Sequence, residues 1–91
     1  MAKDLYLACK KTPLKGNARD QLSRAALSIC LNLSEGSAKQ SAKERRRFYY
    51  IALGSQREVH CILDLEQLSY LTQTSDVLGA SIYRLIRSIR A

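Results

Sequence analysis

The chain has 91 residues, of which 46% are hydrophobic and 25% are charged, and this composition indicates one small globular domain and excludes a disordered chain. One proline and four glycines also argue against a turn-rich β-sandwich. Lys and Arg number 15 against 8 Asp and Glu, and the net charge of +7 makes a polyanion the first partner to consider.

Apolar residues recur at helical spacing throughout, and we predict four helices, at about residues 2–11, 17–35, 41–70 and 75–90. Asn17 is a good N-cap for the second helix, and Gly36 is suited to end it in the left-handed conformation. Ser41 and Glu44 form a capping box before the third. Thr72 to Ser75 separate the third helix from the fourth. The predicted fold class is therefore all-α, an antiparallel up-and-down four-helix bundle over residues 1–91.

Each predicted helix carries one apolar seam for the bundle core. The first helix pairs Leu5 with Cys9. The seam of the second is formed by Leu22, Ala26, Ile29, Cys30 and Leu33. The seam of the third is formed by Phe48, Ala52, Ser55, Val59 and Ile62. The seam of the fourth is formed by Leu78, Ile82, Leu85 and Ile89.

A second apolar line follows the opposite face of the third helix, and the second helix carries a shorter one. The residues of the two lines are Leu27, Leu31, Tyr50, Gly54, Cys61, Leu65 and Leu68. A four-helix monomer needs only one apolar stripe per helix. The remaining helices could wrap around the third and cover this line. We favour self-association, because exposed apolar patches usually mark interfaces.

The excess positive charge lies in the first half of the chain. Residues 1–47 hold 11 basic and 4 acidic residues, whereas residues 48–91 hold 4 of each. The densest run is Lys39, Lys43, Arg45, Arg46 and Arg47, with Tyr50 close by. The fourth helix adds Arg84, Arg87 and Arg90, with Tyr83 between them. Arginines beside tyrosines can bind phosphates and stack on unpaired bases, so these residues are the predicted nucleic-acid-binding set.

Simpler explanations exist for both groups of cations. Arginines near a helix C-terminus interact favourably with the helix dipole, and a charged outer face is normal. The run at residues 39–47 could be a solvated first turn, although cations there oppose the dipole. Attraction of the fourth helix to anionic lipid is a third hypothesis.

The residues that could act in catalysis or bind a metal are not spaced so that they would share one site. The single histidine, His60, is next to Cys61, and adjacent helical residues point about 100° apart. Glu58, Asp64 and Glu66 do not share a helix face. We therefore predict no enzymatic activity, no metal and no cofactor.

The cysteines and the lack of an export signal favour the cytoplasm. Cys9, Cys30 and Cys61 are widely spaced, which is typical of free thiols in a reducing compartment. No run reaches the roughly 20 apolar residues of a membrane span. The first 11 residues carry several charges and do not resemble a signal peptide.

Residues 24–58, RAALSICLNLSEGSAKQSAKERRRFYYIALGSQRE, resemble a known family. The first half matches it at Arg24, Ala25, Ser28, Ile29, Asn32, Glu35, Gly36 and Ser37. The second half matches it at Phe48, Ile51, Ala52, Gly54, Ser55 and Glu58. The family is that of small bacterial four-helix-bundle proteins encoded in intervening sequences of large-subunit ribosomal RNA genes.

The resemblance implies an antiparallel four-helix bundle, usually with a longer first helix, that assembles into a homopentameric ring. A related branch is the accessory variability determinant of diversity-generating retroelements, which binds a reverse transcriptase and its template RNA. Two functions follow as hypotheses. One is a non-catalytic, homo-oligomeric RNA-binding module, which we favour. The other is a protein-interaction adaptor, such as an accessory subunit of a reverse transcriptase.

Overall fold

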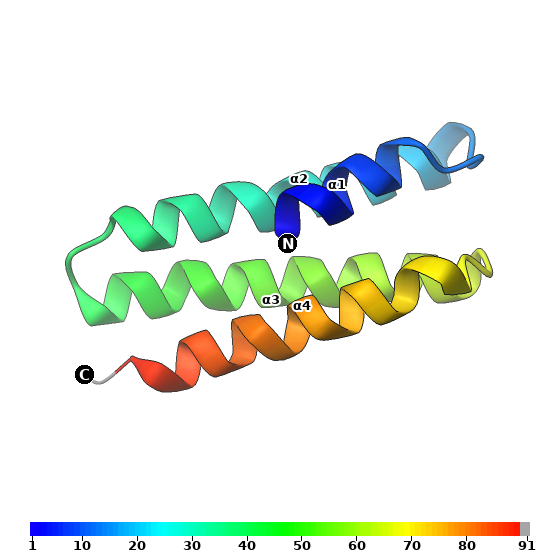
Figure 1. The fold of residues 1–91 in the computed structure, drawn as a ribbon. Coiled ribbons are helices and arrows are strands. Elements are labelled where there is room, and N and C mark those ends of the chain that lie inside the picture. The colour runs from blue at the N-terminus through cyan, green and yellow to red at the C-terminus, as the bar shows by residue number, and fades with distance from the viewer. Residues whose placement is uncertain (90–91) are drawn as a thin grey trace.

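Helical apolar spacing produces four helices in the computed structural model, which describes residues 1–89 (Figure 1). The helices are α1 (Ala2–Lys10), α2 (Gly16–Ala38), α3 (Ala42–Leu65) and α4 (Ser69–Ser88). Helices adjacent in the chain pack against one another, and α1 also contacts α4. The described residues contain no strand. The predicted all-α, antiparallel up-and-down bundle is confirmed.

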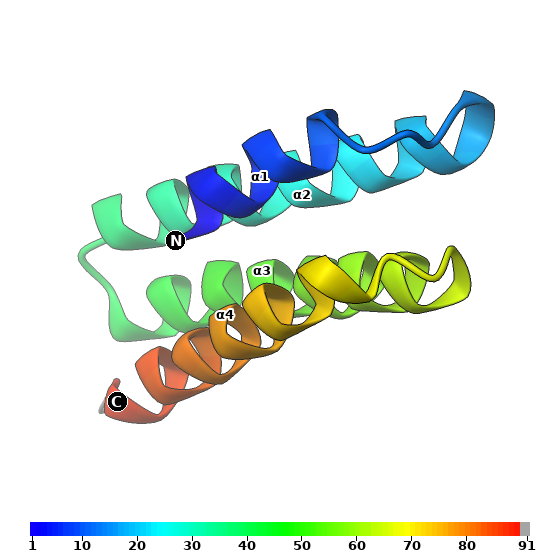
Figure 2. The same ribbon diagram turned by 45° about the vertical axis from the view of Figure 1, so that its right-hand side comes forward.

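The first helix is much shorter than the others, and this makes the two ends of the bundle different. Its 9 residues rise about 14 Å, whereas the 24 residues of α3 rise about 36 Å. It therefore covers α2 and α4 over only part of a molecule 42 Å long (Figures 1 and 2). We call the end with the α1–α2 and α3–α4 connections the four-helix end. The opposite end, with the α2–α3 connection, is the three-helix end.

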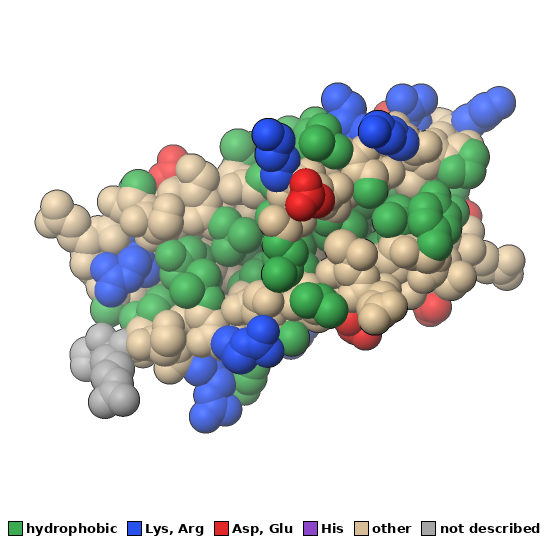
Figure 3. Space-filling view, viewed as in Figure 1, with side chains coloured by type: hydrophobic (Ala, Val, Ile, Leu, Met, Phe, Trp, Pro, Cys, Tyr) green, Lys and Arg blue, Asp and Glu red, His purple; other side chains and the backbone are tan. Residues whose placement is uncertain are grey.

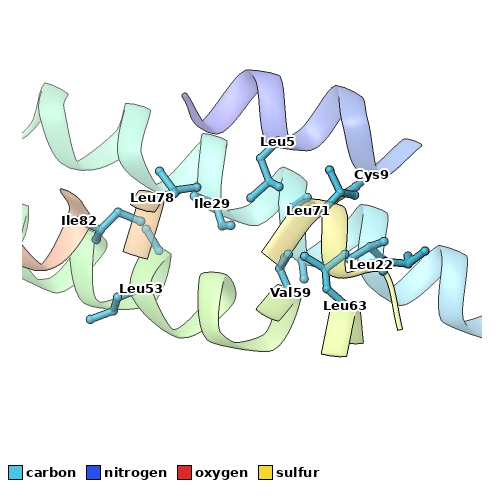
Figure 4. Close-up of a cluster of buried hydrophobic side chains, with 14 of the residues drawn as sticks. Leu5, Cys9, Leu22, Ile29, Leu53, Val59, Leu63, Leu71, Leu78 and Ile82 are labelled. Atoms are coloured by element: carbon cyan, nitrogen blue, oxygen red, sulfur yellow. The ribbon is translucent and has the colours of Figure 1, made fainter. Parts of the chain in front are cut away.

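The hydrophobic core runs along the bundle axis and draws on every helix (Figure 4). Leu5 and Cys9 are buried as predicted and anchor α1. Leu22, Ala26 and Ile29 are the buried part of the predicted α2 seam, while Leu33 is partly buried. A helix as short as α1 is only marginally stable on its own, so its packing into the shared core, and not its intrinsic helix propensity, holds it in place.

The buried face of α3 is rotated from the predicted seam. Of that seam only Ala52 and Val59 are buried, and the other buried residues of α3 are Tyr49, Leu53, Gln56 and Leu63. The reason is that α3 packs between two neighbours, α2 and α4, so its buried arc is centred between them. In α4 the buried residues are Leu71, Ser75, Leu78, Gly79, Ile82 and Ile86. Leu85, predicted for this seam, is largely exposed.

The junction of α3 and α4 lies earlier than predicted, at residues 66–68 instead of 71–74. Gln67 has a left-handed φ of +59°. Its N–H bonds to the Asp64 carbonyl at 3.1 Å, and the Leu68 N–H bonds to the Leu63 carbonyl at 2.8 Å. These two bonds are those of a Schellman motif, which satisfies the last carbonyls of α3. Thr72 is inside α4, where its hydroxyl bonds to the Ser69 carbonyl.

The remaining helix ends agree in part with prediction. Ser41 is the N-cap of α3, and its hydroxyl accepts the Glu44 N–H at 3.4 Å, as expected. Gly36 does not end α2, which continues helically to Ala38. Asn17 is not an N-cap, because α2 begins at Gly16 with Lys15 before it.

Replacing Gln67 with glycine should stabilise the fold. A left-handed conformation costs a non-glycine residue about 1–2 kcal/mol, and glycine adopts it without a Cβ clash. We expect Gln67→Gly to raise the free energy of unfolding by about 1 kcal/mol in urea denaturation. Gln67→Ala, the control, keeps the strain and should give no gain. An unchanged or lower stability of the glycine variant would contradict the strained helix end.

Candidate nucleic-acid interface

The fold brings two separate basic segments of the sequence to one place. The first turns of α3 and the last turns of α4 both lie at the three-helix end (Figures 1 and 2). We call the basic residues there the end cluster: Lys43, Arg46, Arg47, Arg84 and Arg87. Lys and Arg side chains project below the C-terminal part of α4 in the space-filling view (Figure 3). Because the two helices are antiparallel neighbours, these five residues of the predicted set lie at the same end of the bundle.

Most cations of the end cluster remain accessible to solvent. Lys43, Arg84 and Arg87 are exposed, and Arg46 is half-buried. Arg47 pairs with Glu44 at 3.6 Å, but 62% of its side chain is still exposed. An exposed ion pair of this kind is weak and can be exchanged for a phosphate contact. Glu44 is the one acidic residue in this part of α3, so the cluster keeps a positive charge.

Arg45 has a different role from its neighbours. Its Nη1 donates to the Gln40 carbonyl at 2.8 Å and to the Lys39 carbonyl at 3.2 Å. These carbonyls belong to the connection between α2 and α3. The guanidinium therefore fixes the connection, and less of it is free for a phosphate than the sequence suggested.

Lys39 is likewise engaged by the protein itself. Its Nζ lies 3.5 Å from a Glu35 carboxylate oxygen and 5.3 Å from the centre of the Phe48 ring. The guanidinium of Arg47 lies 5.1 Å from the same ring. The two cations flank Phe48 at cation–π distance, which holds both near the α2–α3 connection.

The tyrosines predicted for base stacking are both on the surface. Tyr50 is 53% exposed and Tyr83 is 46% exposed. The guanidinium of Arg87 lies over the Tyr83 ring, 5.8 Å from its centre, at cation–π distance. Arg84 donates to the Ser81 hydroxyl. Arg90, also predicted for this set, lies outside the described residues.

The predicted oligomer interface is exposed except at one position. We call the exposed residues of that set the outer face: Leu27, Leu31, Tyr50, Gly54, Cys61 and Leu65. Leu65 is 74% exposed, whereas Leu68 is 8% exposed and packs into the core. Leu68 is buried because the Schellman motif turns it back over Leu63.

A groove between α2 and α3 adjoins the outer face and was not foreseen from the sequence. It holds about 340 Å³ and is lined by Ala18, Gln21, Glu58, Ile62, Leu65 and Glu66. Its apolar floor comes from residues on two helices. The apolar periodicity of a single helix cannot reveal such a groove, because its lining residues come from two helices.

The residues that resemble the family fasten α2 to α3. The hydroxyls of Ser28 and Ser55 lie 2.8 Å apart, and Asn32 donates to the Ser28 carbonyl and hydroxyl. Gly36 is buried, and a Cβ there would lie 2.5 Å from the Tyr49 ring. Close packing of α2 against α3 therefore explains Ser28, Gly36 and Ser55.

The groove between α3 and α4 holds two of the residues considered for chemistry, His60 and Cys61, whereas Glu58 and Glu66 line the groove between α2 and α3. It has a volume of about 460 Å³, and its lining includes Arg57, His60, Cys61 and Asp76. His60 Nδ1 lies 3.9 Å from Asp76 Oδ1 and has no hydrogen-bond partner among the described residues. No group of three or more potential metal ligands occurs in residues 1–89.

The buried thiol of Cys9 is poorly suited to nucleophilic chemistry. Burial raises its pKa to about 11, so it is protonated at neutral pH. Burial also raises the pKa of Cys30. All three cysteines, including the exposed Cys61, are free thiols.

Comparison with known proteins identifies a family over the whole sequence. The family model described as 23S rRNA-intervening sequence protein matches residues 1–91. No curated protein and no solved structure matches the chain. Within residues 1–89, no helix combines the length and the hydropathy that crossing a membrane requires.

Two adjacent arginines should differ in their effect on stability. Arg45→Gln removes charge-assisted bonds to two carbonyls of the connection, so we expect the free energy of unfolding to fall by about 1 kcal/mol. Arg46→Gln, the matched control, should change it by less than about 0.5 kcal/mol. Urea denaturation of both variants measures the difference. Equal stabilities would show that Arg45 does not fix the connection.

Proposed function

The chain belongs to the 23S rRNA-intervening sequence protein family, and we propose that it is a non-catalytic, homo-oligomeric RNA-binding protein. The observation that carries this proposal is the end cluster, in which α3 and α4 present five cations at one end of the bundle. Lys and Arg are the principal phosphate ligands in nucleic-acid interfaces. The link between the family and ribosomal RNA genes makes RNA the polyanion that we propose.

The end cluster favours recognition of the RNA backbone over recognition of sequence. Its cations are carried by two packed helices, and within residues 1–89 the structure has only the four helices of the bundle as regular elements. Tyr83 supplies an exposed ring on which an unpaired base can stack, whereas Tyr50 belongs to the outer face that we assign to self-association. Binding is then mostly electrostatic, weakens steeply with salt and depends little on sequence.

The outer face supports the oligomeric part of the proposal. Leu31 and Leu65 are more than half exposed on a molecule with a thin core, and the α2–α3 groove extends the apolar area beside Leu65. Exposed apolar side chains together with an apolar groove are typical of interfaces. We propose a homopentamer, in which five chains of charge +7 carry about +35 and strengthen attraction to RNA.

Neutralising the end cluster should weaken RNA binding and its dependence on salt. The variant Lys43→Gln, Arg46→Gln, Arg47→Gln removes three potential phosphate contacts. We expect the slope of log affinity against log salt to become shallower by up to about 2, since each single-strand phosphate contributes about 0.7. The measurement is the affinity for a 20-nucleotide single-stranded RNA over a series of salt concentrations.

The control for this measurement is Lys3→Gln, Arg24→Gln, Arg57→Gln. It removes the same charge from exposed positions outside the end cluster. The slope of the control should stay close to that of the unmodified protein. If the slope of log affinity against log salt were the same for both variants, the end cluster would not be the phosphate-binding surface.

Charges placed on the outer face should dissociate the oligomer. We expect the unmodified protein to sediment as a pentamer at micromolar concentration and Leu31→Glu, Leu65→Glu to sediment as a single chain, because both substitutions bury a charge in an apolar interface. Leu7→Glu, on an exposed position of α1, is the control and should remain pentameric. A monomeric unmodified protein would contradict self-association and favour the adaptor hypothesis, in which another protein covers the outer face.

A further inference from the structure

The four-helix end carries a second basic surface, remote from the end cluster. We define it as the corner cluster: Lys10, Lys11, Lys15 and Arg19, around the connection from α1 to α2. All four side chains are exposed, and none forms an ion pair with an acidic group in residues 1–89. Over residues 10–20 the sequence has four basic residues and one acidic residue, Asp20.

The two basic clusters lie diagonally across the molecule. In the space-filling view, Lys and Arg gather along the upper edge over α1 and the start of α2, and again below the last turns of α4 (Figure 3). The first group is at the four-helix end and the second at the three-helix end of a bundle 42 Å long (Figure 1). The two groups are therefore separated along the length of the bundle and lie at opposite edges of the face seen in Figure 3.

The surface between the clusters is less basic than either cluster, although the exposed cations Arg24 and Arg57 also lie there. On the α3–α4 side, four exposed carboxylates follow the helices toward the four-helix end: Glu58, Asp64, Glu66 and Asp76. On the α2 side, the route crosses the apolar residues Leu27 and Leu31 of the outer face. The carboxylates on the α3–α4 side repel a polyanion, and the apolar residues on the α2 side do not attract one. Both weaken the attraction of a polyanion between the two clusters.

We propose that the corner cluster is a second phosphate-binding surface, so that each chain holds two separate RNA segments at once. This inference rests on the proposed RNA-binding function and extends it from attachment to bridging. A chain with two such surfaces joins two RNA segments or two distant parts of one RNA. Assembly of several chains then multiplies both surfaces.

Short oligonucleotides distinguish two surfaces from one. Six nucleotides span about 20 Å at roughly 3.4 Å per phosphate, about half of the 42 Å length of the bundle. A hexanucleotide with that stacked rise does not reach from one end of the bundle to the other. The number bound per chain reports the number of surfaces, whatever the oligomeric state.

The experiment is a titration of the full chain with fluorescent hexauridylate at low salt. We expect two hexauridylates per chain for the unmodified protein. We expect one for the corner variant, Lys10→Gln, Lys11→Gln, Lys15→Gln, and one for the end variant, Lys43→Gln, Arg46→Gln, Arg47→Gln. Lys10→Arg, Lys11→Arg, Lys15→Arg keeps the charge and should bind two. The triple variant of Lys3, Arg24 and Arg57 to Gln should also bind two, and equal helicity by circular dichroism checks folding.

The possible failures are distinguishable. If the unmodified protein binds no hexauridylate, the proposed RNA-binding function fails. If it binds one, or if the corner variant still binds two, RNA binding survives and the second surface is overturned. If hexaglutamate displaces hexauridylate from the end variant as effectively as unlabelled hexauridylate does, the corner cluster is assigned to acidic protein segments and the RNA assignment is overturned.

Discussion

The close approach of α2 and α3 is the constraint on which the rest of the structure depends. Gly36 leaves room for the buried ring of Tyr49, and a side chain at that position would collide with it. Farther along the same contact, the hydroxyls of Ser28 and Ser55 share a hydrogen bond. Small residues at both points let the two backbones pack closely, and the tolerance for added volume in such a core is small. The register of α3 against α2 is therefore fixed at two separated points.

That register places the surfaces that we assign to function. Once the start of α3 is held against the end of α2, the residues before Phe48 point away from the core at the three-helix end. Arg45 bonds to the connection and fixes the path of the chain there. On the far side of α3, the buried amide of Gln56 donates to the Ser75 carbonyl and hydroxyl, with Gly79 beside it. This second polar contact positions α4 and brings its arginines beside those of α3.

Much of this architecture follows from periodicity, but the details depend on contacts between helices. The number of helices, the Ser41 cap and the core positions of α1 and α2 could be predicted, because each depends on spacing within one segment. The α3–α4 junction could not, because Gln67 occupies a left-handed position that sequence statistics give to glycine. The prediction that Gly36 ends α2 was wrong, because this glycine is required for close packing against Tyr49 and not for a left-handed helix end.

For the candidate surfaces, too, the sequence indicates the residues, but their arrangement depends on contacts between helices. The sequence identified the basic run before Phe48 and the arginines of the fourth helix, yet only the fold joins them. The sequence could not show that the Arg45 guanidinium donates hydrogen bonds to two backbone carbonyls, because the geometry of the turn brings those carbonyls within reach. Basic residues on α1 and α2 form a distinct surface because the short connection folds the two helices side by side. Nine of the 15 basic residues thus lie in two clusters at opposite ends of the bundle, and the effect of the charge on a polyanion depends on that distribution more than on its total.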